Sequence, residues 1–507
     1  MSLIIIIYLF VLFNNCLNLY RKRIKKCEKD VKKSFLVICG LALGMSVNAQ
    51  YLRTSYFMEG SSSRLQLNPG LQPTRGYFNF PVIGSFNVGA SSNVLGVEDI
   101  KDILDSGDNL FENDKLYDRL KDENHLNVNL NTDILSFGWF KGKGFWSVNV
   151  GLRLDVDASI EKNMFEYLRQ VNSFEGVNTI SDLQKLNGGF QNTDLNVRSW
   201  MEIGLGYSRP VTDKLTVGGR VKALLGVGKG QMKVNNFNLS IDYNQEFANL
   251  SQDQIYEGIA NGKYNANDRL GTVKYTADAQ VSTTVKGGGL KYNQDGTISG
   301  FDFKAEDAGV AGLGFGIDLG ASYKVLDNLT VSAAVLDLGY INWKGSETRM
   351  ATVNTTDEDV ITAGNYQEKI DKYSSTDFLN MDRFNLEEDG QSHDSERKKL
   401  ASTIVLAGEY ALLNNALSFG AMYTSRFVQP KTMNELTLSA TLRPKNWFNV
   451  AFSYSPIMAA GKSMGVALKL GPVFLGTDYM FFGKNSQTVN SFVGISFPMG
   501  KKKASID

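Results

Sequence analysis

The twelve-residue segment Trp146–Asp157 constrains the fold of this chain more than any other. Its apolar side chains are Trp146, Val148, Val150, Leu152, Leu154 and Val156. Small or charged residues alternate with them, and the charged ones are Arg153, Asp155 and Asp157. A period of two indicates a β-strand, and at a tilt near 45° it rises roughly 29 Å, enough to cross a bilayer. A soluble sandwich also alternates, but its strands usually run about five or six residues.

Two further segments repeat this alternation. The apolar residues around Glu202 are Met201, Ile203, Leu205 and Tyr207, and those around Asp318 are Ala311, Leu313, Phe315, Ile317 and Leu319. Counting such segments from about residue 76 to residue 498 predicts an all-β fold, a transmembrane antiparallel β-barrel of about 14 strands. We expect its lumen to be lined by Arg153, Asp155, Asp157, Glu202 and Asp318, because these charges lie on the polar faces of their strands.

Aromatic residues flank several of the predicted hairpin turns. Tyr207, Tyr323 and Tyr410 each lie a few residues before Asp or Asn, which tolerate the left-handed backbone of short turns. Trp139 and Trp447 flank two further turns. Amphipathic rings are favoured at a membrane interface, so the pattern predicts an aromatic girdle. Ordinary hairpin packing is the alternative explanation for each single instance.

Long polar insertions separate some of the predicted strands. Phe165, Leu168 and Val171 have helical spacing, and Ser251 with Gln254 predicts a capping box at the start of another helix. The charged stretch 353–400 has no period and predicts a loop. Short turns at one end and long helical or polar insertions at the extracellular end are typical of outer-membrane barrels.

The N-terminus has the features of an export signal. Lys32 and Lys33 precede an apolar run, and small residues precede Gln50, which predicts a signal peptide over residues 31–49. The apolar run within residues 1–30 is eleven residues long, shorter than the roughly 17 that a spanning helix needs. We expect translation to begin at Val31, so that residues 1–30 are a misannotated extension.

Composition excludes several functions. Lys plus Arg and Asp plus Glu are both 53, so no net charge favours a nucleic-acid partner. The three cysteines are Cys16, Cys27 and Cys39. Removal of the signal would leave a chain without thiols, which excludes thiolate catalysis, disulfides and cysteine-bound metals.

Motifs of enzyme chemistry fail on inspection. The Gly-Lys-Ser at 461–463 has Pro456 where a phosphate-binding loop needs its first Gly, and proline offers no N–H. The glycine-rich segment near 312 has Ile317 where a dinucleotide loop needs its third Gly. The two histidines, His125 and His393, lie far apart without a nucleophile motif. We therefore expect no enzyme activity, no catalytic residues, no cofactor and no metal site.

Residues 50–75 differ from the rest of the exported chain because they lack strand periodicity. They contain a Ser-rich stretch followed by Asn68-Pro69, and alternation begins only at Tyr77. A Ser-rich start, an Asn-Pro pair and then barrel strands resembles the FadL-type outer-membrane proteins of the hydrophobic-compound transporter group, in particular an uncharacterised barrel family found in Bacteroidota. The resemblance implies an N-terminal plug over 50–75, a barrel over 76–498 and a polar tail over 499–507.

The resemblance also implies a function in the outer membrane of a Gram-negative cell. It implies a channel for passive uptake of a small hydrophobic compound, which leaves through a lateral gap in the wall. Outer-membrane lipid and a small hydrophobic ligand are then the expected partners. Relatives in this group also carry secreted proteins at the cell surface. The alternative is therefore a surface carrier or accessory barrel for a protein secretion or assembly system, with a secreted or surface protein as partner.

Overall fold

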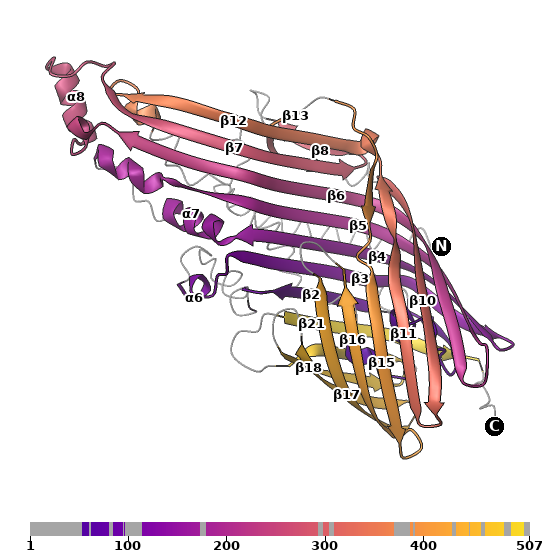
Figure 1. Ribbon diagram of the computed structural model, residues 1–507. Helices are drawn as coiled ribbons and strands as arrows, with labels where there is room; N and C mark the ends of the chain where they lie inside the picture. Colours follow the sequence, from indigo (N-terminus) through magenta and orange to yellow (C-terminus); the bar gives the residue numbers. More distant parts are fainter. Residues whose placement is uncertain are drawn as a thin grey trace.

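One antiparallel sheet of nineteen strands dominates the computed structural model of this chain (Figure 1). The residues that the structure describes are 53–59, 62–80, 85–94, 96, 114–172, 179–292, 298–303, 309–369, 386–388, 391–427, 432–445, 447–457, 462–480 and 488–500. The expected signal peptide and the segment before it lie outside these residues.

The strands of this sheet are β1 (Gly76–Asn79), β2 (Phe86–Ser92), β3 (Glu123–Lys141), β4 (Gly144–Glu161), β5 (Gly188–Pro210), β6 (Leu215–Tyr243), β7 (Arg269–Val285), β10 (Gly312–Leu326), β11 (Leu329–Trp343), β12 (Thr348–Thr362), β13 (Glu387–Glu388), β14 (Glu396–Lys399), β15 (Thr403–Leu412), β16 (Leu417–Arg426), β17 (Met433–Lys445), β18 (Phe448–Ile457), β19 (Ser463–Leu470), β20 (Val473–Met480) and β21 (Thr488–Met499). A separate hairpin consists of β8 (Gly288–Tyr292) and β9 (Ile298–Phe303). The α-helices are α3 (Arg53–Tyr56), α4 (Ser63–Leu67), α6 (Asp114–Tyr117), α7 (Lys162–Asn172) and α8 (Gln252–Ala260), and the 3-10 helices are η2 (Ile180–Leu186), η3 (Gln245–Phe247) and η5 (Gly345–Glu347).

The sheet closes on itself into a barrel. Both β1 and β2 pair with β21 on one side and with β3 on the other, so together they form one position in the wall. Within the described residues the wall has fourteen positions, in the order β1/β2, β3, β4, β5, β6, β10, β11, β14/β15, β16, β17, β18, β19, β20 and β21. This confirms the antiparallel barrel of about fourteen strands predicted from the alternation.

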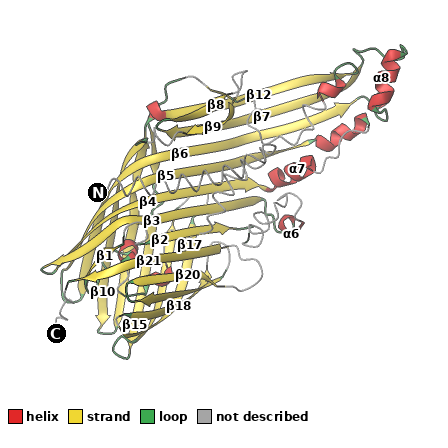
Figure 2. Cartoon of the chain, turned by 180° about the vertical axis from the view of Figure 1, so that it is seen from behind, coloured by secondary structure: helices red, strands yellow, loops and turns green. Residues whose placement is uncertain are grey.

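The long strand β6 forks the wall. Its first part, up to Gly226, pairs with β10, whereas its second part, from Gly228, pairs with β7. Val227 is one extra residue opposite the Ser199–Trp200 step of β5, which makes a β-bulge at the fork. Beyond this point β6, β7 and β12 continue as a sheet that projects from one side of the barrel (Figures 1 and 2). We refer to this part, from residue 228 of β6 through β7 and β12 with the paired part of β5, as the extension sheet.

The two ends of the barrel differ. One end carries tight turns between β3 and β4, β5 and β6, β10 and β11, and β15 and β16. Gly142, Asn414 and Asn415 have the positive φ angles that such turns require. The helices α6, α7 and α8 gather at the opposite end (Figure 2). The predicted capping box of α8 is present, with Ser251 and Gln254 each accepting the other's backbone N–H.

The loop predicted over 353–400 is wrong in part. The strand β12 includes residues 353–362, and β14 takes up 396–399. The sequence of β12 is rich in Thr and acidic residues, which have no alternation of apolar side chains. Its strand conformation comes instead from an almost continuous ladder with β7, from Thr348 to Thr362. Among the described residues, no helix is long and apolar enough to cross a membrane.

Candidate functional site

The outer face of the barrel wall is apolar and exposed. On β5, β6 and β10 the outward residues include Ile203, Leu205, Val221, Leu313 and Phe315, all more than two fifths exposed. The aromatic residues expected near the turns are exposed as well, and they are Trp139, Tyr207, Tyr323, Tyr410 and Trp447. An apolar band flanked by aromatic side chains is the surface that a membrane barrel presents to lipid. The wall therefore has a lipid-facing outside and a polar inside.

The inner face carries the five charged residues that the sequence singled out. Arg153, Asp155, Asp157, Glu202 and Asp318 are all buried. In its own strand, each charged residue alternates with the exposed apolar residues and therefore lies on the opposite face. That face is the inside of the wall. The structure brings them into two groups, one around Glu202 and Asp318 and one around Asp155 and Asp157.

The first group is a buried network of ion pairs. Lys222 Nζ lies 2.7 Å from Asp318 Oδ1 and also pairs with Asp337. Arg220 donates from Nε to Asp318 Oδ2 at 2.7 Å. The side chains of Lys222 and Asp318 are almost completely buried, so the pairs compensate charges that have lost their hydration.

Glu202 extends this network to β4. Its carboxylate lies 3.4 Å from Arg153 and 3.7 Å from Lys222, and it accepts from Asn149 at 3.2 Å. Sequence reasoning missed Arg220, Lys222 and Asp337, although Arg220 and Lys222 alternate with apolar residues along β6 in the same way. Asp337 gave no such signal because it is a bulge residue with a φ of 57°.

The second group lies further toward the helical end of the wall. Asp157 pairs with Arg198 at 2.8 Å and accepts from Asn127 at 2.6 Å. Asp155 accepts from Asn129 at 3.0 Å, and Arg426 of β16 reaches it at 3.5 Å. Because β16 lies on a distant part of the wall from β4, this last contact crosses the inside of the barrel.

Residues 53–72, which we call the N-terminal segment, contact strands from many sides of the wall. Arg53 pairs with Glu435 of β17 at 2.9 Å, and Gln66 donates to Asp133 of β3 at 2.7 Å. Thr54 shares a hydrogen bond of 2.6 Å with Ser453 of β18. A segment that touches β3, β17 and β18 and is largely buried lies within the ring of strands.

A chain of charges holds the other side of this segment. Arg64 lies 2.8 Å from Glu409, and Arg443 pairs with both Glu409 and Glu59. Burial favours a neutral Arg64, but the carboxylates of Glu409 and Glu59 hold its pKa above the ordinary value. Burial also raises the pKa of Tyr56, whose hydroxyl lies 2.6 Å from that of Ser332. The charged side chains of the segment therefore remain paired ions.

Asn68 and Pro69, the pair singled out in the sequence, lie against β6, β10 and β11. Asn68 donates from its amide to the carbonyl oxygens of Ala321 and Ala333, at 3.3 Å each. A Cβ at Gly218 would lie only 2.1 Å from the Pro69 carbonyl oxygen, and one at Gly320 the same distance from Asn68 Oδ1. The wall thus has glycine where the backbone of the segment approaches closely.

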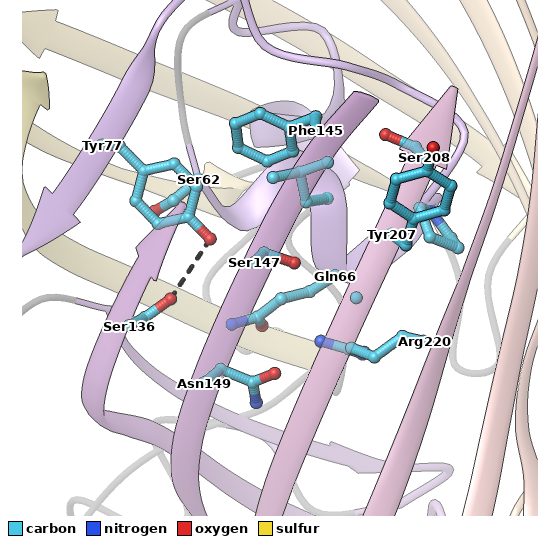
Figure 3. Close-up of a pocket in the computed structure, with 13 residues that line it drawn as sticks. Ser62, Gln66, Tyr77, Ser136, Phe145, Ser147, Asn149, Tyr207, Ser208 and Arg220 are labelled. Carbon is cyan, nitrogen blue, oxygen red and sulfur yellow. Dashed lines mark hydrogen bonds between the residues drawn. The ribbon is translucent and has the colours of Figure 1, made fainter. Parts of the chain in front are cut away.

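A narrow pocket lies between the N-terminal segment and the strands β3, β4, β5 and β6 (Figure 3). Gln66 and Ser62 line it from the segment, and Ser147, Asn149 and Arg220 line it from the wall. Tyr77 and Ser136 share a hydrogen bond of 3.3 Å at its border. Leu65, Pro69 and Phe145 line the pocket as well, so hydroxyl, amide and apolar groups face the same narrow space.

An apolar cluster that the alternation did not predict lies next to the ion-pair network. Its buried members are Trp200, Leu224, Ala311, Ile341 and Trp343, and Leu400 packs against them. Leu224 follows Lys222 on the inner face of β6, so the cluster adjoins the network on the side of the fork. The inside of the barrel is therefore not uniformly polar.

The ladder of the wall is interrupted beside this cluster. β11 pairs with β15 from Leu329 to Leu336 and with β14 from Tyr340 to Trp343. Between these two ladders, the backbone bond that bridges the strands runs from Leu400 N–H to the Gly339 carbonyl, at 3.0 Å. We call this stretch, residues 337–339 of β11 and 400–402 beside it, the wall break.

Enzyme-like groups do not gather in the described part of the chain. His125 lies on β3, 3.7 Å from Glu123, whereas His393 lies close to Gly345. Among the described residues, no group of three His, Cys, Asp or Glu side chains has the arrangement of a metal site.

Comparisons with known proteins agree on a barrel. A family model described as a family of unknown function (DUF5723) matches residues 69–478. No curated protein matches the chain in sequence. Among solved structures, the chain is similar to the TodX deltaS2S3 mutant monoaromatic hydrocarbon channel, at 11% identity and a TM-score of 0.40, with 86% of this chain and 94% of that chain covered.

Two more solved structures are similar to the chain at comparable identity and TM-score. The Ralstonia pickettii toluene transporter TbuX is 10% identical with a TM-score of 0.37, covering 88% of this chain and 94% of that chain. A Pseudomonas aeruginosa FadL homologue is 10% identical with a TM-score of 0.31, covering 89% and 98%. Similarity at this level of identity and TM-score decides nothing about function or ligand.

Proposed function

The chain belongs to this family of unknown function, DUF5723, and we propose that it is an outer-membrane channel for passive uptake of a small hydrophobic compound. The observation that carries the proposal is the wall break beside the apolar cluster. A closed barrel wall is held by ladders of backbone hydrogen bonds, so a stretch with one bridging backbone bond separates at little cost. In the proposed pathway, the compound leaves the apolar cluster sideways through this stretch.

Leu400 is the gate in this proposal. Its Cδ1 would lie 3.5 Å from a Cβ at Gly316, an inward-facing position of β10, so the side chain points into the barrel. It also packs against the cluster of Trp200 and Trp343. Rotation of one leucine side chain would open a path from the cluster to the wall break.

Residues 50–75 act as a plug in this proposal. The contacts of the N-terminal segment with opposite parts of the wall, through Gln66, Arg64 and Arg53, support that role. Such a plug closes the straight route along the barrel axis to water and ions. The sideways route through the wall break is then the one that an apolar compound takes.

Whole-cell uptake tests this function. Gram-negative cells that produce the protein should take up labelled ethylbenzene faster than cells with an empty vector, because the lipopolysaccharide layer slows the unassisted route. Leu400→Ala should raise this rate. The matched control Leu406→Ala, on the exposed outer face of β15, should leave it unchanged. Equal uptake with and without the protein would reject the channel.

A second candidate function is the surface carrier or accessory barrel. The extension sheet supports it, because a channel needs no wall beyond the membrane, whereas the 29 residues of β6 reach well past the fork. Crosslinking in intact cells separates the two candidates. A stoichiometric protein partner linked to β7 or β12 favours the carrier, and its absence together with ethylbenzene uptake favours the channel.

A further inference from the structure

Four residues on neighbouring strands form one row across the inner face of the wall. Trp200 of β5 pairs with Gly226 of β6, Gly226 pairs with Gly312 of β10, and Gly312 pairs with Trp343 of β11. The row therefore reads Trp-Gly-Gly-Trp and crosses the wall at the fork of β6. Cross-strand neighbours in such a row share one face of the sheet, so both indole rings point into the barrel.

The two glycines make room for an indole ring. A Cβ at Gly226 would lie 2.7 Å from Cζ3 of Trp343, and a Cβ at Gly312 would lie 3.0 Å from Cε3 of the same ring. The ring of Trp343 therefore lies against the bare backbone of both strands. Only glycine at these two positions allows this approach.

Both indole N–H groups lack an acceptor. Trp200 is 6% exposed and Trp343 is 1% exposed, and neither Nε1 has a hydrogen-bond acceptor in the described part of the chain. Their buried neighbours Leu224, Ala311 and Ile341 offer only apolar side chains. Buried tryptophan usually finds a partner for its N–H, because an unpaired donor costs free energy. Two such donors in one apolar cluster are available to an acceptor from outside the chain.

We propose that this cluster binds a small aromatic compound that carries a hydrogen-bond acceptor, such as a carbonyl oxygen, in preference to a pure hydrocarbon. The inference deepens the proposed function and rests on it. The flat rings and the aliphatic neighbours receive the apolar part of the compound, and an indole N–H donates to its oxygen. A hydrocarbon of the same shape fills the same space but leaves both donors unpaired.

The matched pair acetophenone and ethylbenzene tests the preference, because the two differ by a carbonyl in place of a methylene. Isothermal titration calorimetry on the detergent-solubilised protein should give a dissociation constant about tenfold lower for acetophenone, the ratio expected for one neutral hydrogen bond. In Trp343→Phe and in Trp200→Phe, the ratio should fall, and in at least one of them it should approach one. Trp447→Phe, on the exposed outside, should keep the wild-type ratio.

A spectroscopic measurement avoids dependence on variant folding. The chain has five tryptophans, so protein labelled with ¹⁵N-indole gives at most five side-chain N–H resonances. Acetophenone should move one or both buried resonances downfield, and ethylbenzene should not produce this downfield shift.

Equal dissociation constants for the two compounds, or a ratio that survives both Phe variants, would overturn the inference and leave the channel standing if ethylbenzene uptake is observed. Binding of neither compound also overturns the inference. The uptake experiment then decides the fate of the proposed channel separately.

Discussion

β5 and β6 each run through the barrel and the extension sheet, and their apolar outer face is covered in different ways in the two regions. In the barrel, their outward residues Ile203, Leu205 and Val221 are between 42% and 47% exposed. In the extension sheet, the residues that continue the same outer face are buried, with Phe237 and Ile241 at 3% and 0%. The outer face of β5 and β6 is thus exposed in the barrel and buried in the extension sheet.

The cover of the extension sheet comes from the chain itself. Tyr167 and Leu168 of α7, with Leu183 of η2, pack in one cluster with Phe237 and Ile241. Apolar side chains need such a cover in water, whereas lipid tails provide it in the bilayer at no conformational cost. The start of α7 and η2 on the outer face therefore marks where the wall leaves the membrane.

The inner faces show the opposite order. In the barrel Lys222 is buried and its charge is matched by Asp318 and Asp337, whereas Lys233 in the extension sheet is exposed. Lys222 is thus confined where the wall is closed, whereas Lys233 is solvated where the wall opens out. The same alternation of apolar and polar residues thus suits a wall in lipid and a sheet in water. The change from one to the other lies at the fork of β6.

The largest expected effect comes from breaking the confined charges. Lys222→Met should lower the free energy of unfolding by about 3–5 kcal/mol, because it leaves buried carboxylates uncompensated. The same change at Lys233 should cost less than about 0.5 kcal/mol. Urea unfolding from lipid vesicles, followed by the mobility shift of the folded barrel, measures both. Similar losses for the two variants would contradict the contrast between the inner faces.

A charge on the outer face should come next in size. Leu205→Arg should cost about 2 kcal/mol, because Leu205 lies on the apolar outer face two residues inside Tyr207 of the aromatic girdle. Tyr256→Arg, at an exposed position of α8, serves as the control and should cost less than about 0.5 kcal/mol. The same unfolding assay applies, and tolerance of arginine at Leu205 would show that lipid does not cover this face.

A smaller effect separates the two apolar surfaces directly. Ile241→Val should cost about 0.5–1.5 kcal/mol, because it removes a buried methylene from the covered cluster. Ile203→Val should be nearly neutral, because lipid tails fill the space. Hydrogen exchange of the β6 and β7 amides reports the first loss, and the global unfolding assay reports the second. An equal cost at both sites would mean that the barrel band packs against protein.

The smallest effect is spectroscopic. Brominated phospholipid should quench Trp447, which is 55% exposed, but should not quench Trp343, which is 1% exposed. Trp447→Phe should therefore remove part of the quenched emission, and Trp343→Phe should remove emission that was never quenched. Quenching of Trp343 would move that ring from the inside of the wall to the outside.

The alternation of apolar and polar residues predicted much of the fold. Strict alternation around Arg153, Glu202 and Asp318 predicts strands with one charged face, and the observed barrel has fourteen positions with those residues buried. The turns and the helix capped by Ser251 also follow from local chemistry. Each of these features depends on residues that are close in sequence.

The remaining features depend on the register, that is, on which residues of neighbouring strands pair. The alternation within one strand does not determine this register. The Trp200–Trp343 row requires that four strands align, and the extra residue Val227 shifts that alignment at the fork. The strand β12 forms along the ladder that β7 offers, since Thr355, Asp357 and Asp359 interrupt the apolar face that includes Val353 and Ile361. The contacts of Arg64 and Gln66 join residues separated by 345 and 67 positions, respectively.

The length of β6 has a mechanical consequence. A single hydrogen-bonded strand of 29 residues belongs to the barrel at one end and to the extension sheet at the other, and its bulge at Val227 adjoins the row of Trp200, Gly226 and Trp343. A force on the projecting sheet is therefore transmitted to the barrel through this bulge and through the row of residues beside it.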